Sequence, residues 1–238
     1  MEHRTNCIKA VYLLFCIAGA FLCHCQTTSH PVWHDSLNTA KNEDYMTETE
    51  KEIIHELNKV RTNPRAYIRY LKEERTYYDG KIRKQAGISL RTNEGLGAVD
   101  ECIAVLENAA PAGMLYPHEN LCKVAGLLAK DQAKTGLTGH TDSKGNSLLK
   151  RATRCSISSS LLGENIFYGK HTPRHIVVQL LIDDGVPSRG HRNNIMNVEF
   201  NFCGVAIDTH PTFLSVCVMD FGQFNMEKEK NKSDKSNN

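Results

Sequence analysis

Apolar residues recur at three- and four-residue intervals in five segments, which is the spacing of amphipathic helices. The first segment, 47–61, begins with Thr47 and Glu50 at capping-box spacing, so a helix start is expected there. A second helix is expected from Asn63-Pro64, because asparagine caps helices well and proline suits their first turn. The other three helices are expected over residues 96–108, 119–134 and 172–181.

Two later segments, 202–207 and 213–220, show the pattern of strands and flank a turn. Centring this hairpin on His210 places Cys203 opposite Cys217, which predicts a cross-strand disulfide, with two packed thiols as the alternative. Both faces of the pair are mostly apolar, so layers should cover both sides of the sheet. Because helices are the only other elements, we expect an α+β fold with three layers, an α-β-α sandwich.

The start of the chain has the features of a secretory signal peptide over residues 1–25. A basic region precedes the apolar stretch from Ala10 to Cys23, and cleavage is expected after Cys25. A membrane anchor is the alternative, but a bilayer span needs about 20 apolar residues. No other segment is long enough to span a bilayer, so we expect a secreted protein without an integral membrane segment after cleavage.

Three further segments lack a clear pattern. Residues 26–46 are polar and aperiodic and are expected to form a linker, and the weakly patterned residues 77–93 are expected to form a loop. Residues 226–238 are charged and almost without apolar side chains, so they cannot bury enough surface to order and are expected to be disordered. One domain, 47–225, remains between the two ends.

The composition is that of a soluble protein, with 40% hydrophobic and 24% charged residues and a net charge of +2. A charge so close to neutral argues against nucleic acid or an anionic membrane as the main partner. Four of the nine cysteines lie in the predicted signal peptide. The cysteines that remain are odd in number, so in an oxidising compartment at least one is free or bonds another chain. They are Cys102, Cys122, Cys155, Cys203 and Cys217.

The main candidate site consists of two histidines and two acids. His140, Glu164 and His191 each follow a glycine, which permits tight turns and close backbone approach, and Asp183 lies shortly before His191. Imidazoles with carboxylates can bind a divalent cation such as zinc. They can also provide a general base oriented by an acid, or form a polar network that only pins loops. All four residues are expected in loops or at the ends of elements, and their spacing leaves these three readings open.

Other candidates are weaker. His171 and His175 have the spacing of a helical metal pair, but a helix start lies between them, so both are expected at the surface. Cys155 could be a nucleophile, although a structural cysteine is favoured. Arg189 and Arg192 flank His191 and could pair with the acids at 183 and 184 in surface salt bridges. The sequence contains no Gly-x-Ser-x-Gly elbow, His-Glu-x-x-His helix or glycine-rich phosphate loop, which argues against the common hydrolase and nucleotide-binding classes.

Four motifs occur in a fixed order. They are Leu57-Asn58 with Arg61 and Pro64, His140-Thr141-Asp142, Gly163-Glu164-Asn165-Ile166, and Gly190-His191-Arg192-Asn193-Asn194-Ile195 followed by Gly204-Val205-Ala206. Each motif alone has low specificity, but together they resemble the CAP superfamily, also called the SCP domain. That group includes cysteine-rich secretory proteins, antigen 5 and pathogenesis-related proteins. The resemblance covers roughly residues 47–224, and the last motif is typical of the branch with Gly-His-Arg-x-Asn-Ile.

The resemblance implies a three-layer α-β-α sandwich, in agreement with the patterning. It also implies a cleft with two histidines and two acids, which in some members binds a divalent cation, usually zinc. Residue by residue, these positions are His140, Glu164 and His191, with Asp183 where members often have glutamate. Because aspartate is one methylene shorter, the affinity for a cation depends on this position. His140 and His191 would be the metal ligands.

The leading functional hypothesis is a secreted, non-catalytic CAP-domain protein that binds a ligand or an extracellular protein. The resemblance suggests a sterol or other lipid as the ligand and a divalent cation in the cleft. One alternative is a metal-assisted hydrolase or protease, with Glu164 as general base and the two histidines as metal ligands. The other alternative is an extracellular interaction protein in which the four residues are purely structural.

Overall fold

The computed structural model describes residues 32–159, 161–227 and 229. The predicted signal peptide, part of the predicted linker and most of the predicted tail lie outside the described residues. The described residues from Trp33 onward form one compact unit. Within this part of the chain, no helix is long and apolar enough to cross a membrane.

The elements alternate irregularly along the chain. The helices are η1 (Asp35–Leu37, a 3₁₀ turn), α1 (Glu48–Thr62), α2 (Pro64–Arg75), α3 (Leu96–Asn108), α4 (Glu119–Thr135), α5 (Leu148–Arg154), α6 (Pro173–Ile182) and α7 (Gly190–Met196). The strands are β1 (Tyr78–Asp79), β2 (Ile82–Gln85), β3 (Ile88–Arg91), β4 (Tyr116–Pro117), β5 (Leu162–Tyr168), β6 (Phe202–His210) and β7 (Leu214–Gly222).

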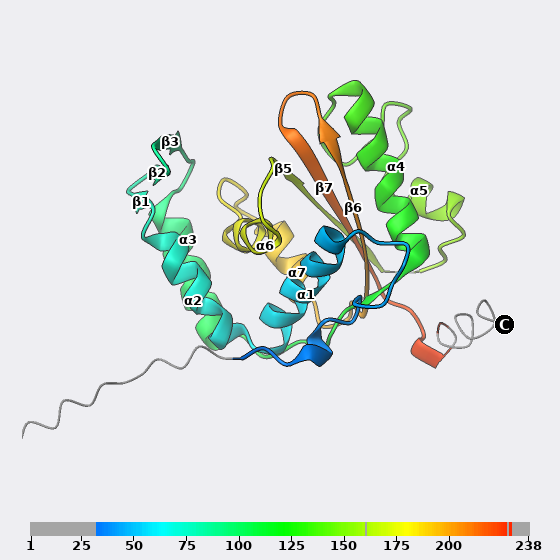
Figure 1. Cartoon of the computed structure of the whole chain (residues 1–238), viewed down its shortest axis with the longest axis horizontal. Helices are drawn as coiled ribbons and strands as arrows, with labels where there is room; N and C mark the ends of the chain where they lie inside the picture. Colours follow the sequence, from blue (N-terminus) through cyan, green and yellow to red (C-terminus); the bar gives the residue numbers. More distant parts are fainter. Residues whose placement is uncertain (1–31, 160, 228, 230–238) are drawn as a thin grey trace, which may run out of the picture. The chain divides into compact units, whose positions relative to one another are not determined.

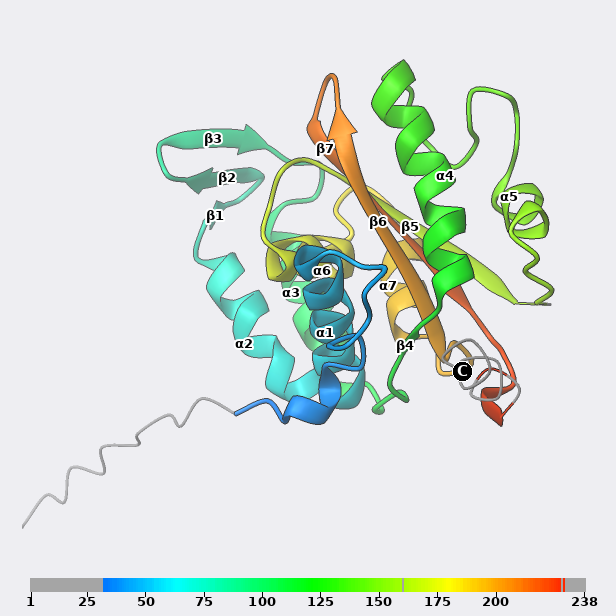
Figure 2. The same cartoon turned by 45° about the vertical axis from the view of Figure 1, so that its right-hand side comes forward.

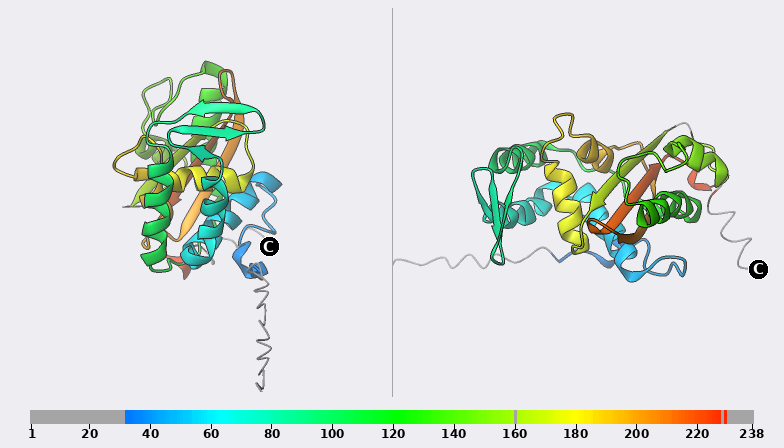
Figure 3. Two further views of the ribbon diagram at one scale, coloured as in Figure 1. Left: turned by 90° about the vertical axis from the view of Figure 1, so that its left-hand side faces the viewer. Right: turned by 90° about the horizontal axis from the view of Figure 1, so that it is seen from above.

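The main sheet has the strand order β4-β6-β7-β5, so β5 is an edge strand. The β5-β7 and β6-β7 pairs are antiparallel, and β4 runs parallel to β6. Helices α4 and α5 lie on one face, while α1, α6 and α7 lie on the other, with α2 and α3 outside them (Figures 1 and 3). The predicted α-β-α sandwich is therefore confirmed.

Alternating side chains of the sheet build a core on each face. Ile166, Val216 and Val218 pack with the buried residues of α4. Val205 and Met219 point the other way, into the larger core that α1, α2, α3 and α6 share. This two-sided burial explains why both faces of the strands are apolar in the sequence.

The local signals at the helix ends act as predicted. Thr47 and Glu50 form a capping box in which each side chain accepts a hydrogen bond from the other's backbone N–H. The side chain of Asn63 caps α2 by accepting the N–H of Ala66 at 3.0 Å. Gly136 ends α4 in the left-handed conformation, which turns the chain toward His140.

The predicted disulfide is wrong, because the register of the hairpin differs from the expected one. β6 extends through His210, which pairs with Leu214, so the turn is centred two residues later than predicted. Cys203 consequently lies opposite Phe221, and Cys217 lies opposite Ile207. The two cysteines are offset by four residues, about 13 Å along the strands, and no disulfide spans that distance. Every described cysteine is a free thiol.

The loop predicted over 77–93 is also wrong, since this segment forms a second, three-stranded antiparallel sheet between α2 and α3 (Figure 2). The β2-β3 turn consists of Ala86 and Gly87, which both have positive φ, as in a type I′ turn. All four residues of β3 are exposed. Only β3 alternates apolar and polar residues, as Ile88-Ser89-Leu90-Arg91, and with both of its faces exposed this four-residue pattern was too short to reveal the sheet.

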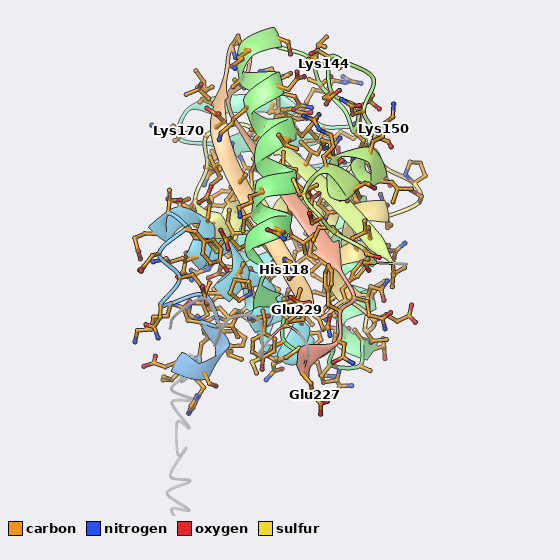
Figure 4. The ribbon with its side chains drawn as sticks, turned by 90° about the vertical axis from the view of Figure 1, so that its right-hand side faces the viewer. His118, Lys144, Lys150, Lys170, Glu227 and Glu229 are labelled. Atoms are coloured by element: carbon orange, nitrogen blue, oxygen red, sulfur yellow. The ribbon has the colours of Figure 1, made fainter. Side chains whose placement is uncertain are left out.

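The ends of the described chain pack against the domain. In the segment predicted as a linker, Trp33 donates a hydrogen bond to the Tyr70 hydroxyl at 2.9 Å, and Ala40 is buried in the core. At the other end, Glu229 Oε2 lies 3.4 Å from His118 Nε2, at the start of α4 (Figure 4).

Candidate functional site

His140 and Glu164 form the first of two histidine–carboxylate pairs. His140 lies in the loop after α4, and its Nδ1 is 2.8 Å from Glu164 Oε1 on β5. The imidazole is 58% exposed, whereas the Glu164 side chain is buried. A carboxylate only accepts hydrogen bonds, so Nδ1 carries the proton and donates it. In the neutral imidazole, Nε2 of His140 then has a lone pair, and no described residue bonds to it.

Arg151 of α5 donates hydrogen bonds to both members of this pair. Its side chain is fully buried and donates to the second oxygen of Glu164. Nη1 also donates to the backbone carbonyls of His140 and Asn146, each at 3.0 Å. One guanidinium therefore neutralises the buried carboxylate and fixes the loop that carries the histidine.

Asp183 and His191 form the second pair. Asp183 ends α6 in the left-handed conformation, with φ 56°, which aspartate tolerates better than most residues. Its Oδ1 is 2.6 Å from His191 Nδ1, and its Oδ2 accepts the backbone N–H of His191 at 2.9 Å. The carboxylate thus caps α7 and orients the imidazole, whose side chain is 23% exposed.

The two pairs are anchored on adjacent residues of β5. Glu164 holds His140, while the side chain of Asn165 donates to the backbone carbonyl of His191 at 3.0 Å. Asn194 of α7 ties them together by donating to Asn165 Oδ1 at 2.8 Å and to the Glu164 carbonyl at 3.2 Å. Side chains of neighbouring strand residues point to opposite faces. The pairs therefore approach the edge strand from its two sides.

The described residues contain no group of three or more His, Cys, Asp and Glu side chains that could hold a metal ion. The four predicted site residues therefore form two separate histidine–carboxylate pairs. Each acid is bonded to a histidine, and the two histidines are tied to the same short stretch of β5.

Residues 54–221, more than half of the chain, match the family model of the cysteine-rich secretory protein family, CAP. The chain belongs to this family. No curated protein matches the chain.

Among solved structures, the CAP chain matches an extracellular SCP-domain protein of Bacillus anthracis at 23% identity, covering 48% of this chain and 35% of that one, with a TM-score of 0.40. It therefore spans about a third of that protein. It also matches an outer surface protein of Borrelia burgdorferi at 21% identity, covering 48% of this chain and 80% of that one, with a TM-score of 0.41. A cysteine-rich secretory protein of Staphylococcus aureus matches at 10% identity, covering 60% and 46%, with a TM-score of 0.39.

Sequence reasoning missed a third acid in this CAP domain. Asp220 lies on β7 directly opposite Glu164 and is fully buried. Neither of its carboxyl oxygens has a hydrogen-bond partner among the described residues. Burial, together with the neighbouring Glu164 carboxylate, raises the pKa of Asp220 well above its usual range. An acid within an otherwise apolar strand is the signal that could have revealed it.

The arginines beside His191 pair with more distant acids than predicted. Arg192 is buried and makes two bonds with Glu101 of α3, at 2.8 and 2.6 Å. Arg189 bonds both oxygens of Glu94 and lowers the pKa of that carboxyl to about 2. The carboxylate of Asp184 instead accepts backbone N–H groups just before α3. These contacts join the start of α7 to α3.

The other candidates have no catalytic arrangement. The rings of His171 and His175 stack at 4.2 Å, with His171 exposed and His175 partly buried. Burial lowers the pKa of both and brings that of His175 to about 4. Burial also raises the pKa of the Cys155 thiol, which is the wrong direction for a nucleophile.

A pocket of about 340 Å³ lies beside the Asp183–His191 pair. One wall comes from the small sheet and the segment after it, and the other from β5 and the end of α6. The lining includes Tyr78, Leu90, Arg91, Phe167, Leu180, Asp183, Asp184, Val186 and His191. His140 and Glu164 do not line this pocket.

Proposed function

We propose that this chain is a secreted, non-catalytic CAP-domain protein that binds a ligand or an extracellular partner and holds a divalent cation through His140 and His191. The observation that carries the proposal is that the two histidine–carboxylate pairs have the same arrangement. Each imidazole is fixed through Nδ1 by a buried carboxylate, which leaves Nε2 as the free nitrogen. Carboxylates placed behind metal-binding histidines orient the ring and raise its basicity in the same way.

Zinc accepts imidazole nitrogen at about 2.0–2.1 Å, and each histidine would contribute one ligand through Nε2. Glu164 and Asp183 would act behind the histidines rather than as ligands, because His140, Arg151 and backbone N–H groups already occupy their oxygens. A cation held by two imidazoles would complete its coordination with water or with a bound ligand. The cation would supply positive charge at the edge of β5.

The same hydrogen bonds argue against a hydrolase. Glu164 is the acid that would serve as general base, yet one of its oxygens is bonded to His140 and the other to a buried arginine. No described thiol is activated as a nucleophile. Hydrolysis of a peptide library that is lost in both His140→Ala and His191→Ala would support the protease alternative instead.

A purely structural role for the four residues is supported by a specific observation. Asp183 caps α7, and Glu164 balances a buried arginine, so both acids stabilise the fold without any ligand. The melting temperatures of wild type and His191→Ala, each measured with and without chelator, separate the two roles. If the cation binds only the folded state, chelator lowers the melting temperature of the wild type alone.

Zinc binding is the direct test. Isothermal titration of the purified protein should give one site that is lost in both His140→Ala and His191→Ala. His175→Ala is the matched control, because this histidine belongs to the separate stacked pair, and it should bind zinc like the wild type. Binding that survives in either site variant, or disappears in the control, would refute the cation site.

The lipid part of the proposal derives from family membership. Titration of the purified protein with a sterol and with a fatty acid tests it, and failure of both would leave an extracellular protein as the proposed partner.

A further inference from the structure

We propose that the free edge of β3 binds an extended, acidic segment of an extracellular protein, which adds to the small sheet as a fourth strand. This inference rests on the extracellular-partner part of the proposed function and not on the cation or the lipid. β3 is an edge strand of the sheet β1-β2-β3, and Figure 2 shows it as the outermost strand of that sheet. An edge strand presents unpaired backbone groups with which another chain can pair.

The register of the β2-β3 hairpin shows which backbone groups are free. The residues that flank a two-residue turn form a hydrogen-bonded pair, so Ile88 bonds with β2, and such pairs recur at every second residue. Thr92 fits this alternation, because its N–H donates to the Lys81 carbonyl at 2.8 Å. The N–H and C=O groups of Ser89 and Arg91 therefore point away from β2, and no described residue pairs with them.

The side chains of β3 define what an added strand must carry. Ile88 is 71% exposed and Leu90 57%, and both point to the same face because they are two residues apart. Ser89 and Arg91 point to the opposite face, which is polar. Residues directly opposite each other in a strand pair are in contact through their side chains. A strand beside β3 would therefore cover the two apolar side chains with its own apolar residues and place its polar residues beside Arg91.

The charge of the hairpin favours an acidic strand. Residues 81–91 contain two lysines, two arginines and no acid. Two of these four cations form ion pairs with acids of α2 and β1, whereas Arg91 has no ion-pair partner among the described residues. A free guanidinium binds carboxylates through paired N–H groups, so a glutamate or aspartate opposite Arg91 would add a charge-assisted hydrogen bond.

A second copy of this chain fits the same edge less well. Pairing of β3 with another β3 would bring together two hairpins that both carry an excess of positive charge. Like charges opposite each other in a strand pair are destabilising, and charged side chains on edge strands are a common protection against self-pairing. The same charges attract an acidic segment, which is why we infer an acidic partner rather than a copy.

A synthetic octapeptide of alternating glutamate and valine, with both ends blocked, is a suitable probe. Its alternation allows valines to cover Ile88 and Leu90 while glutamates lie beside Arg91. Isothermal titration in the presence of a chelator keeps the measurement independent of any cation. We expect this peptide to bind the wild type, more weakly at high salt because the charges are exposed. The peptide with lysine in place of glutamate should show no measurable binding.

N-methylation of the probe tests the backbone pairing directly. The N–H groups of successive residues in a strand point to opposite edges, so methylating all valines and methylating all glutamates block opposite edges of the peptide. One methylated peptide should bind at least about tenfold more weakly than the parent, because it loses its hydrogen bonds to β3, and the other should bind like the parent. Equal affinities of the two would show that the peptide does not pair as a strand, and would refute the proposal.

Two variants locate the site on β3. Ser89→Pro removes an N–H that points outward, so the β2-β3 pairing should remain while probe binding falls about tenfold or more. Ser89→Thr is the matched control, because it keeps this N–H, and it should bind like the wild type. Arg91→Glu should also weaken binding about tenfold or more. Its control is Arg154→Glu, at an exposed position of α5 on the other side of the main sheet, which should leave the affinity unchanged.

No binding of the glutamate–valine peptide would overturn the proposal, as would equal affinity of wild type and Ser89→Pro for it. A wild type that sediments as a dimer and becomes a monomer in Ser89→Pro would also overturn it, because the edge would then bind a second copy. These outcomes are separate from a failure of the proposed function. A protein that binds zinc or a sterol but not the peptide refutes only the strand site. One that binds the peptide with these variant effects but not zinc refutes only the cation site.

Discussion

The two histidine–carboxylate pairs use the same contact but are supported in opposite ways. At Glu164 the support is a buried side-chain charge, Arg151, whereas at Asp183 it is the backbone at the start of α7. The histidines differ as well, since His140 is 58% exposed and His191 23%. A buried ion pair depends on both of its members, while a helix cap is a local contact of modest energy. Equivalent site residues can therefore carry very different shares of the stability of the fold.

The largest effect is expected at Arg151. Arg151→Met leaves the Glu164 carboxylate buried without its cation and should cost about 3–5 kcal/mol in the free energy of unfolding. Urea denaturation measures this change. Adding Glu164→Gln should recover part of the loss, because the second substitution removes the uncompensated charge. Arg154→Met on the same helix is the control, expected to stay within about 0.5 kcal/mol. An equally small effect at Arg151 would show that the pair is not buried as described.

A pH-dependent effect is expected at Asp220, which lies opposite Glu164 in the sheet. The pKa of this carboxyl is raised in the fold, so between about pH 3.9 and the raised value the folded state binds more protons than the unfolded state. Stability from this group therefore falls as pH rises. Asp220→Asn removes that loss, so its stability advantage over wild type should grow as the pH rises above about 3.9.

Asp100→Asn provides a control of opposite sign. Its bond to Arg75 lowers the pKa of the Asp100 carboxyl, so this group contributes stability that is lost as pH falls. The variant should therefore show no advantage that grows with pH. Unfolding curves at several pH values test both changes, and a flat difference between wild type and Asp220→Asn would contradict the prediction.

An intermediate effect is expected at Asp183. Asp183→Ala removes the cap of α7 and the partner of His191, at a cost of about 1–2 kcal/mol. Asp183→Asn should cost less, because an amide oxygen can still accept the N–H of His191 and asparagine also tolerates the left-handed conformation. Thermal denaturation compares the two variants. Equal losses would show that the negative charge, rather than the cap, provides the stability.

The smallest effects are expected at the histidines themselves. His140→Gln should change stability by no more than about 0.5 kcal/mol, because the side chain is largely exposed. His191→Gln should cost more, about 1 kcal/mol, since its ring meets a buried carboxylate. Parallel urea titrations resolve the order of the two. A larger loss of stability in His140→Gln than in His191→Gln would contradict this prediction.

The long helices could be predicted from the sequence, because their apolar stripes and capping residues are local signals. α5 and α7 are shorter, with few buried side chains each, and were not recognised. β5 was missed because Glu164 and Asn165 interrupt its apolar residues. The hairpin register was misjudged because both faces of β6 and β7 are apolar, so a shifted pairing costs no burial that the sequence could reveal.

The candidate site also contains residues that the sequence could reveal and residues that it could not. The glycine-flanked motifs identified His140, Glu164 and His191, and the resemblance supplied Asp183. Their partners depend on long-range contacts that no local spacing encodes: Arg151 reaches Glu164 from α5, and Asn194 reaches β5 from α7. The pocket could not be foreseen either, because the small sheet that forms one wall had been taken for a loop.

The free cysteines have a practical consequence. The described domain needs no oxidant to fold, so expression in a reducing bacterial cytoplasm should yield the same structure as secretion. Dithiothreitol should leave its melting temperature unchanged. Burial raises the pKa of Cys102 and of Cys122 to about 12, which keeps both as thiols and slows alkylation. Cys155, which is less enclosed, should be the first position to accept a maleimide dye, so the folded domain offers one preferred site for labelling.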